Sequence, residues 1–292
     1  MQTIKKNTNR KSKARKILSM FLAVLMTLSV FTLGVSAAGL KKLDLAFVVD
    51  TTASMSDDIY QVKEDMKVYL NDLKDAGLDF RIAIVDYRDF ASRTGTSRDY
   101  PYCVQLDFTS DENAIINAID SLTLGNGGDG NETIYSALID GLNKLSWREE
   151  SGKASILMGD APALDPEPFT GYTAEKAIDT LKNGLIASES VRYSAKAKGA
   201  VALEDKKRSQ VTLFAIATSS NSSTIRCFNT LSEGTGGKSY VANNSSEITE
   251  IITEIIDEIP EIVQDNELSF WEKIKKFFRI VWYVISFQWG KI

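Results

Sequence analysis

The chain has 292 residues, of which 43% are hydrophobic and 25% charged, as expected of a globular protein with a full core. It contains no histidine, which excludes the commonest general base and the usual zinc ligand. Residues 1–37 hold seven of the 34 Lys and Arg residues and none of the 39 Asp and Glu residues, so 27 basic and 39 acidic side chains follow. This acidic remainder argues against a nucleic-acid partner, because phosphate binding needs clustered Lys and Arg.

Residues 1–37 are typical of a secretory signal peptide. A basic segment from Lys5 to Lys16 precedes an apolar run from Leu18 to Val35, and Val35-Ser36-Ala37 resembles a small-residue cleavage site. The alternative is an N-terminal membrane anchor, because the run is about long enough to span a bilayer. We expect a secreted, extracellular or cell-surface protein. The long basic segment resembles those of Gram-positive bacterial exports.

Short apolar runs alternate with helical patterns from residue 42 to residue 260. Strands are predicted at 43–49, 80–85, 102–108 (an edge), 154–158, 211–217 and 238–242. Helices are predicted at 54–76, 111–122, 132–145, 173–188, 224–231 and 246–259. The alternation predicts an α/β fold: a doubly wound, mostly parallel six-stranded sheet flanked by helices.

Two aspartates end strands that flank the predicted switch point of this sheet. Asp50 follows the first strand and Asp160 the fourth. In the order 3-2-1-4-5-6 these strands are neighbours, and ligands bind beyond their carboxyl ends. The hydroxyls of Thr52 and Ser54 follow Asp50 closely. Such oxygen ligands favour Mg²⁺, or else Mn²⁺ or Ca²⁺, over zinc and copper.

Three loops of the chain resemble those of one known family. Residues 50–54, Asp-Thr-Thr-Ala-Ser, resemble the D-x-[ST]-x-S signature of von Willebrand factor A domains, their metal-ion-dependent adhesion site. The loop at 127–133 is similar to the family's second metal loop, and 157–162 resembles its third. The resemblance covers about residues 40–260 and implies the Rossmann-like fold of that family.

By this resemblance, four residues are assigned to a metal site: Asp50, Thr52, Ser54 and Asp160. The second loop departs from the commonest family pattern, in which a threonine follows the glycines closely. It is similar to a subgroup with a G-G-x-D-x-x-E loop, so Asp129 is assigned as the fifth residue, with Glu132 and Thr133 as alternatives.

Structural interpretations stand beside these assignments. Asp50 and Ser54 could serve only as helix-capping groups. The sequence Tyr87-Arg88-Asp89 is interpreted as a structural Arg–Asp pairing. Cys103 and Cys227 are predicted to be unpaired, because the assumed strand order puts them at opposite edges of the sheet.

The family resemblance implies a binding module rather than an enzyme. The cation would bridge the domain to an acidic residue of an extracellular protein. The alternative is a metal-dependent hydrolase or phosphatase that uses the same carboxylates. The sequence offers it no histidine, no evident phosphate clamp and no G-x-S-x-G nucleophile turn.

The C-terminal end differs in composition from the body. An acidic linker at 261–269 precedes a tail at 270–292, which has apolar residues at helical spacing together with lysines and aromatic residues. This pattern predicts an amphipathic helix for membrane or cell-surface association. Packing against a partner is the alternative, and in a third reading this tail is the functional part and the domain a scaffold.

Overall fold

The computed structural model describes residues 41–128, 130–184 and 210–262, with side chains as far as residue 259. The predicted signal peptide, Asp129, the tail at 270–292 and all but the first two residues of the predicted linker lie outside these ranges. Within them, no helix is long and apolar enough to cross a membrane.

The described residues form a six-stranded sheet in the order β3-β2-β1-β4-β5-β6, which confirms the predicted topology. The β2–β3 pair is antiparallel and every other pair is parallel, so β3 is the predicted edge strand. The strands are β1 (Lys41–Asp50), β2 (Leu78–Tyr87), β3 (Cys103–Thr109), β4 (Gly152–Gly159), β5 (Thr212–Ala217) and β6 (Ser239–Val241).

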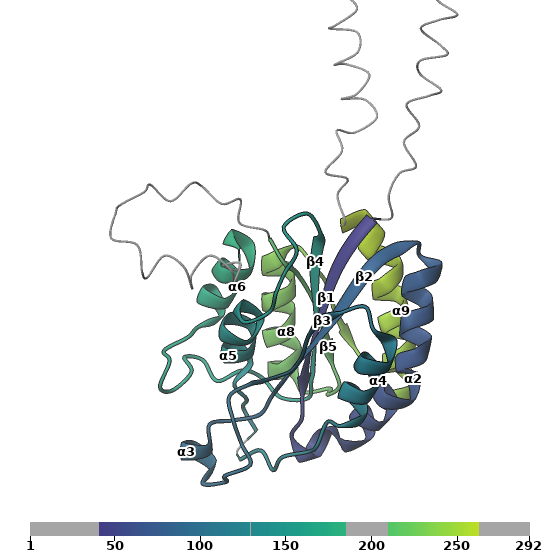
Figure 1. The fold of residues 1–292 in the computed structure, drawn as a ribbon. Helices are drawn as coiled ribbons and strands as arrows, with labels where there is room; N and C mark the ends of the chain where they lie inside the picture. The colour runs from purple at the N-terminus through teal and green to yellow at the C-terminus, as the bar shows by residue number, and fades with distance from the viewer. Residues whose placement is uncertain (1–40, 129, 185–209, 263–292) are drawn as a thin grey trace, which may run out of the picture. The chain divides into compact units, whose positions relative to one another are not determined.

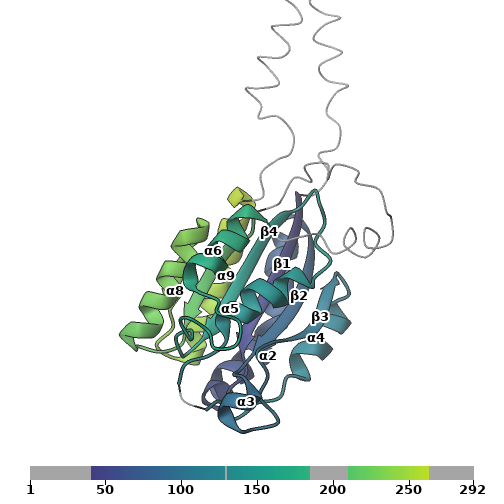
Figure 2. The same cartoon turned by 90° about the vertical axis from the view of Figure 1, so that its left-hand side faces the viewer.

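Helices cover both faces of this sheet (Figures 1 and 2). One face carries α2 (Ser56–Asp75), α4 (Glu112–Asp120) and α9 (Ser245–Ile262). The other carries α5 (Ile134–Ser136), the π-helical segment η2 (Ala137–Gly141), α6 (Ala174–Asn183) and α8 (Ser222–Thr235). A 3₁₀ turn, η1 (Ala53–Met55), and the short helix α3 (Ala91–Thr94) lie in the connections.

Strand β1 shows why the sheet lies in the middle of the protein. Every residue from Leu43 to Asp50 is buried, as expected of a parallel strand covered on both faces. Leu45, Phe47 and Val49 pack into the cluster with α2 and α9, whereas the alternate residues Ala46 and Val48 face the opposite cluster. The strand therefore delivers its last residue, Asp50, to the carboxyl edge of the sheet.

Two local predictions differ from the structure in an informative way. The helix predicted from residue 132 begins at Ile134 and widens into the π-helical segment η2, so Glu132 and Thr133 lie in the loop before it. Helix α6 ends at Asn183, before the predicted end at residue 188, and Gly184 is its C-cap. Asp111, the first residue of the helix predicted at 111–122, caps α4: its carboxylate accepts hydrogen bonds from the backbone N–H groups of Asn113 and Ala114.

Cys103 on β3 and Cys227 on α8 are both free, which confirms that they are unpaired.

Candidate metal centre

Asp50 lies fully buried at the carboxyl end of β1. Its Oδ1 accepts hydrogen bonds from the Thr52 backbone N–H at 2.8 Å and the Thr52 hydroxyl at 2.7 Å. The Ser54 hydroxyl lies 3.2 Å from that of Thr52. The second carboxylate oxygen, Oδ2, has no hydrogen-bond partner. The turn thus gathers three predicted ligands and leaves a buried oxygen unsatisfied.

Close packing keeps β4 against this carboxylate. A Cβ built on Gly159 would come within 2.4 Å of the Tyr87 hydroxyl and 3.2 Å of Asp50 Oδ2, so only glycine fits at this position. Asp160 follows directly, and its charge interacts with that of Asp50. Its backbone carbonyl accepts a hydrogen bond from the Thr224 hydroxyl of α8 at 3.0 Å. The structure therefore brings Asp50 and Asp160 together, as the sequence predicted.

The second loop contributes Glu132 to the same place. Glu132 is only 3% exposed, and its Oε2 has no hydrogen-bond partner. A Cβ on Gly127, which has a φ of 61°, would lie 3.0 Å from the Thr52 methyl group and 3.3 Å from Glu132 Oε1. Backbone hydrogen bonds join Glu132 to the third loop through Pro162 and Leu164. Glu132 thus sits between the glycine-rich loop, the Asp50 turn and the loop that begins at Asp160.

The Thr133 hydroxyl is bonded to backbone carbonyl groups. Its hydroxyl lies 2.7 Å from the Pro101 carbonyl oxygen and 3.0 Å from that of Arg88, so these carbonyls are its partners. Of the alternatives for the second loop, the described side chains therefore favour Glu132 over Thr133. Asp129 lies outside the described residues.

Asp58, in the first turn of α2, also faces this end of the sheet, and the sequence reasoning missed it. Its Oδ1 accepts a hydrogen bond from the Ser245 hydroxyl at 2.8 Å, and its charge interacts with that of Asp160. Burial raises its pKa. A carboxylate one turn after the signature, at the positive end of a helix, was the available signal.

The Arg–Asp pairing predicted within Tyr87-Arg88-Asp89 is wrong in its partners. Arg88 lies 4.0 Å from Asp86 and donates to the Thr51 hydroxyl, whereas Asp89 pairs with Arg93 at 3.0 Å. Side chains adjacent in an extended segment point in opposite directions, so neighbours cannot pair easily. Both contacts nevertheless brace the loops around the centre.

Burial and crowding of like charges raise the pKa values of two site carboxyls. Burial, assisted by the charges of Asp160 and Asp86, raises the pKa of Asp50 to about 7 against the lowering effect of the Thr52 hydrogen bonds. Burial, followed by the charges of Asp50 and Asp89, raises the pKa of Glu132 to about 9. The charges of the neighbouring carboxylates thus disfavour the ionised forms of Asp50 and Glu132.

The residues fit a hard divalent cation. Asp50 Oδ2 and Glu132 Oε2 are buried oxygens without donors, and a cation would satisfy both. The described residues hold no group of three or more Asp, Glu, Cys or His spaced to bind a metal by themselves. The hydroxyls of Thr52 and Ser54 must therefore complete such a site, which suits Mg²⁺ better than a softer metal.

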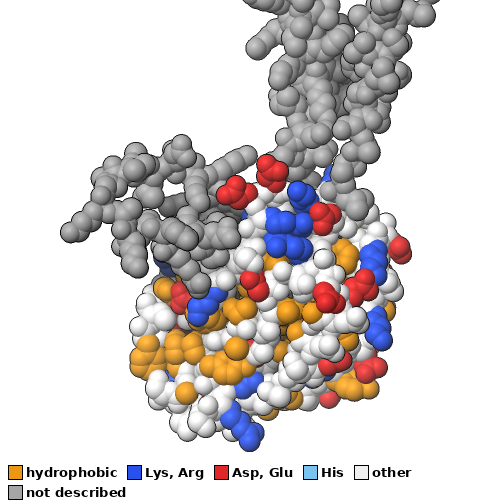
Figure 3. All heavy atoms as spheres, viewed as in Figure 1, with side chains coloured by type: hydrophobic (Ala, Val, Ile, Leu, Met, Phe, Trp, Pro, Cys, Tyr) orange, Lys and Arg blue, Asp and Glu red, His pale blue; other side chains and the backbone are white. Residues whose placement is uncertain are grey.

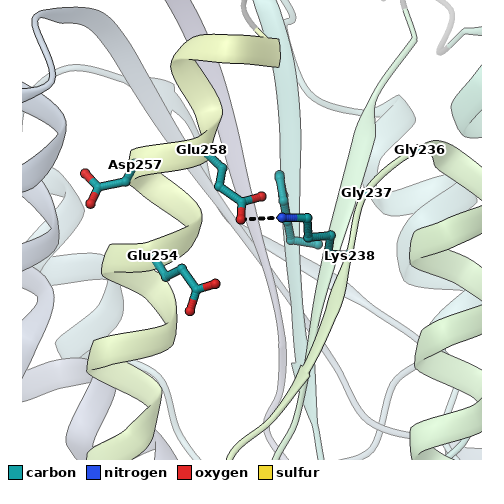
Figure 4. A pocket seen from close by; sticks show the side chains of 7 residues that line it. Gly236, Gly237, Lys238, Glu254, Asp257 and Glu258 are labelled. Atoms are coloured by element: carbon teal, nitrogen blue, oxygen red, sulfur yellow. Dashed lines mark hydrogen bonds and ion pairs between the residues drawn. The ribbon is translucent and has the colours of Figure 1, made fainter.

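A hollow lies at the opposite, amino-terminal edge of the sheet, between α9 and the turn before β6 (Figure 4). Its charged lining includes Lys238, which pairs with Glu258 at 2.5 Å, and the nearby acids Glu254 and Asp257. It shares no residue with the candidate centre.

Comparison with known proteins gives the chain a family. The family model described as von Willebrand factor A domain matches residues 44–244. The alpha-protein kinase vwkA of Dictyostelium discoideum is 29% identical over 127 residues, which are 42% of this chain and 19% of that protein. The chain thus corresponds to about a fifth of that relative's length.

Two solved structures are similar to the chain at low sequence identity. A von Willebrand factor type A protein from Catenulispora acidiphila is 13% identical, with a TM-score of 0.48 over 75% of this chain and 43% of that one. Proximal thread matrix protein 1 from the mussel byssus, with a zinc-occupied MIDAS motif, is 16% identical, with a TM-score of 0.47 over 75% and 46%.

Proposed function

The chain belongs to the von Willebrand factor A domain family, and from this premise we propose that it binds an acidic group of an extracellular protein through a divalent cation. The observation that carries the proposal is the pair of buried, donorless oxygens, Asp50 Oδ2 and Glu132 Oε2. A fold that excludes water from two carboxylates without satisfying them is destabilised by roughly 1–3 kcal/mol for each unsatisfied group. A bound cation removes that destabilisation.

We assign the cation's protein ligands to Asp50, Thr52, Ser54 and Asp160, with Glu132 or Asp129 from the second loop. When bound, a Mg²⁺ ion (or Mn²⁺ or Ca²⁺) supplies an electrophilic centre that accepts a carboxylate oxygen from another molecule. The hydrogen bonds from Thr52 fix the orientation of Asp50, and the exposed Ser54 stands on the solvent side. The residues of the chain would thus hold the cation on its inner side, and its outer side would stay open to the partner.

We further propose that this site binds its partner without catalysis. Arg88 lies beside the loops of the centre, but its guanidinium donates to Thr51, to the Arg98 carbonyl and to the Thr123 carbonyl. A guanidinium engaged in this way is not available as a phosphate clamp. We place the binding outside the cell, on the strength of residues 1–37, with residues 270–292 as a membrane-associating segment.

Calorimetric titration of Mg²⁺ and of Mn²⁺ into the purified chain tests the proposal. We expect saturable binding at one site, lost in Asp50→Ala and kept in Thr133→Val. Thr133 is the control because its hydroxyl contacts backbone carbonyl groups. If the parent protein binds neither ion, the metal-dependent function is rejected.

A further inference from the structure

Phe169 is exposed in an unusual way. It lies on the loop that leads from Asp160 to α6, its side chain is 73% exposed, and its backbone φ is 70°. A bulky residue in the left-handed region is strained. Because the ring is exposed to water, burial in the core does not offset this strain. Figure 3 shows hydrophobic side chains gathered at the lower left, over the part of the surface where this loop runs in Figure 1.

The loop around Phe169 is firmly held. The buried Glu167 accepts hydrogen bonds from the Ser136 backbone N–H at 2.9 Å and from its hydroxyl at 2.6 Å. The Thr170 hydroxyl donates to the same carboxylate, and the Gly171 N–H donates to the Glu167 carbonyl at 2.9 Å. The surrounding contacts thus determine the strained conformation, and they present the aromatic ring on a rigid support.

The ring contacts a residue that follows β2 at the carboxyl edge of the sheet, where the candidate metal centre lies. Phe169 packs edge-on against Phe90, with the ring centroids 5.1 Å apart. The backbone N–H of Phe90 donates to Asp89, whose charge interacts with that of Glu132. The Phe169 loop itself begins at Asp160 and pairs with Glu132 through Pro162. The Phe90–Phe169 pair therefore forms an aromatic ridge that adjoins the second and third loops of the centre.

We propose that this aromatic ridge is the apolar half of the binding surface, which selects a protein segment with an apolar side chain a few residues from the carboxylate that meets the cation. This inference rests on the proposed function and specifies its partner. A rigid, exposed aromatic side chain next to a polar anchor point is the arrangement that concentrates binding energy in an interface. A free carboxylate, such as acetate, meets the cation but gains nothing from the ridge.

An array of synthetic peptides tests the proposal on the full chain. Each peptide carries one central Asp in a Gly–Ser background, and a single Phe or Leu is placed at successive positions on either side. Binding is compared in Mg²⁺ and in EDTA for the parent, Phe169→Ser, Phe169→Gly and Tyr60→Ser. Tyr60 is the matched control, because it is 63% exposed on α2, which covers the other face of the sheet.

We expect apolar residues at a few defined positions to strengthen Mg²⁺-dependent binding about ten-fold. Both Phe169 variants should lose this gain and keep the weak binding of the Gly–Ser peptide, and Tyr60→Ser should keep both. Phe169→Gly should in addition raise the melting temperature, because glycine relieves the left-handed strain. A stabilised variant with weaker binding separates a binding role from a structural one.

Other outcomes overturn the inference in distinguishable ways. Metal-dependent binding that ignores the apolar residue, or that Phe169→Ser leaves intact, rejects the ridge and keeps the proposed function. Absence of any metal-dependent binding, together with no metal uptake in calorimetry, rejects both. A concentration-dependent dimer that Phe169→Ser dissociates, measured by sedimentation velocity, would assign the ridge to a second copy of the chain instead.

Discussion

Strand β1 carries two fully buried aspartates, one near each end, and their surroundings differ sharply. Asp44 accepts five hydrogen bonds, two from the Arg81 side chain, two from Arg148 and one from the Ser151 hydroxyl. Asp50 accepts two, both on Oδ1, and its Oδ2 accepts none. The same residue type, on the same strand and equally buried, is thus satisfied by the fold at one end and left incomplete at the other.

The comparison separates a structural carboxylate from one suited to an external ligand. Burial alone does not distinguish them, because both are 0% exposed. Their neighbours distinguish them, because two guanidinium groups pair with Asp44, whereas the charges that act on Asp50 are those of other acids. A buried carboxylate without a cationic partner in the protein is where a cation from solution is expected.

The largest expected effect is at the satisfied end. Asp44→Ala should lower the free energy of unfolding by about 3–5 kcal/mol, because it removes the carboxylate that pairs with Arg81 and one of the two that pair with Arg148. Urea unfolding should show the same loss in Mg²⁺ and in EDTA. A loss that depended on Mg²⁺ would mean that the two ends of β1 are not independent.

Asp50→Asn should behave in the opposite manner. In EDTA the variant should be as stable as the parent or more stable by on the order of 1 kcal/mol, because it removes a buried, incompletely satisfied charge. With Mg²⁺ at a hundred times its Kd, the parent should gain about 2.7 kcal/mol and the variant nothing. Thermal unfolding with and without Mg²⁺ measures both effects, and a variant that keeps the gain would remove Asp50 from the site.

The pH dependence of stability should have an unusual sign when no metal is present. The pKa values of Asp50 and Glu132 are raised to about 7 and about 9, so the folded state keeps protons that the unfolded chain releases near pH 4. Their contribution to stability is therefore complete below about pH 4 and is lost as the pH rises through 7 and 9. Mg²⁺ must displace those protons, so its affinity should increase over the same window.

Melting temperatures of the parent and of Asp50→Asn, each in EDTA at about pH 5, 7 and 9, isolate this contribution from that of the other acids. The difference between the two proteins should shift in favour of the variant as the pH rises. A shift in favour of the parent would contradict the raised pKa of Asp50.

A smaller effect distinguishes the residues of the second loop. Glu132→Gln should weaken Mg²⁺ binding about ten-fold, because it removes a negative charge from the ligand set. Thr133→Val should leave Mg²⁺ affinity unchanged and cost about 1 kcal/mol of stability through its lost hydrogen bonds. Calorimetry of these variants and of Asp129→Asn identifies the fifth metal ligand. If Glu132→Gln binds Mg²⁺ with the affinity of the parent, Asp129 is assigned as that ligand instead.

The smallest effect on the folded domain should come from the C-terminal end. Deletion of residues 265–292 should leave the melting temperature and Mg²⁺ binding unchanged, because the residues assigned to the cation all lie between Asp50 and Asp160. Sedimentation with anionic lipid vesicles should show binding by the full chain and none by the truncated chain. Equal vesicle binding by both proteins would reject the tail as a membrane-associating segment.

The sheet was predictable because its strands are buried on both faces and their apolar runs stand out. The order of the strands and the meeting of Asp50 with Asp160 followed from that pattern and from the family resemblance. The roles of Glu132 and Thr133 did not follow, because adjacent residues of one loop diverge through backbone contacts with Arg88 and Pro101 that only the folded chain creates. Asp58 was missed because on sequence it is one acidic residue among several on a helix.

Asp50 and Asp160 lie far apart in the sequence and become neighbours only when β1 pairs with β4. A cation that requires both therefore cannot nucleate folding, and an extended chain in transit across a membrane has no site to carry it. The ion bound at the centre would then depend on the ions present where β1 pairs with β4, and not on those present where the chain is synthesised. For an exported protein, the extracellular abundance of Mg²⁺, Ca²⁺ or Mn²⁺ would decide its working form.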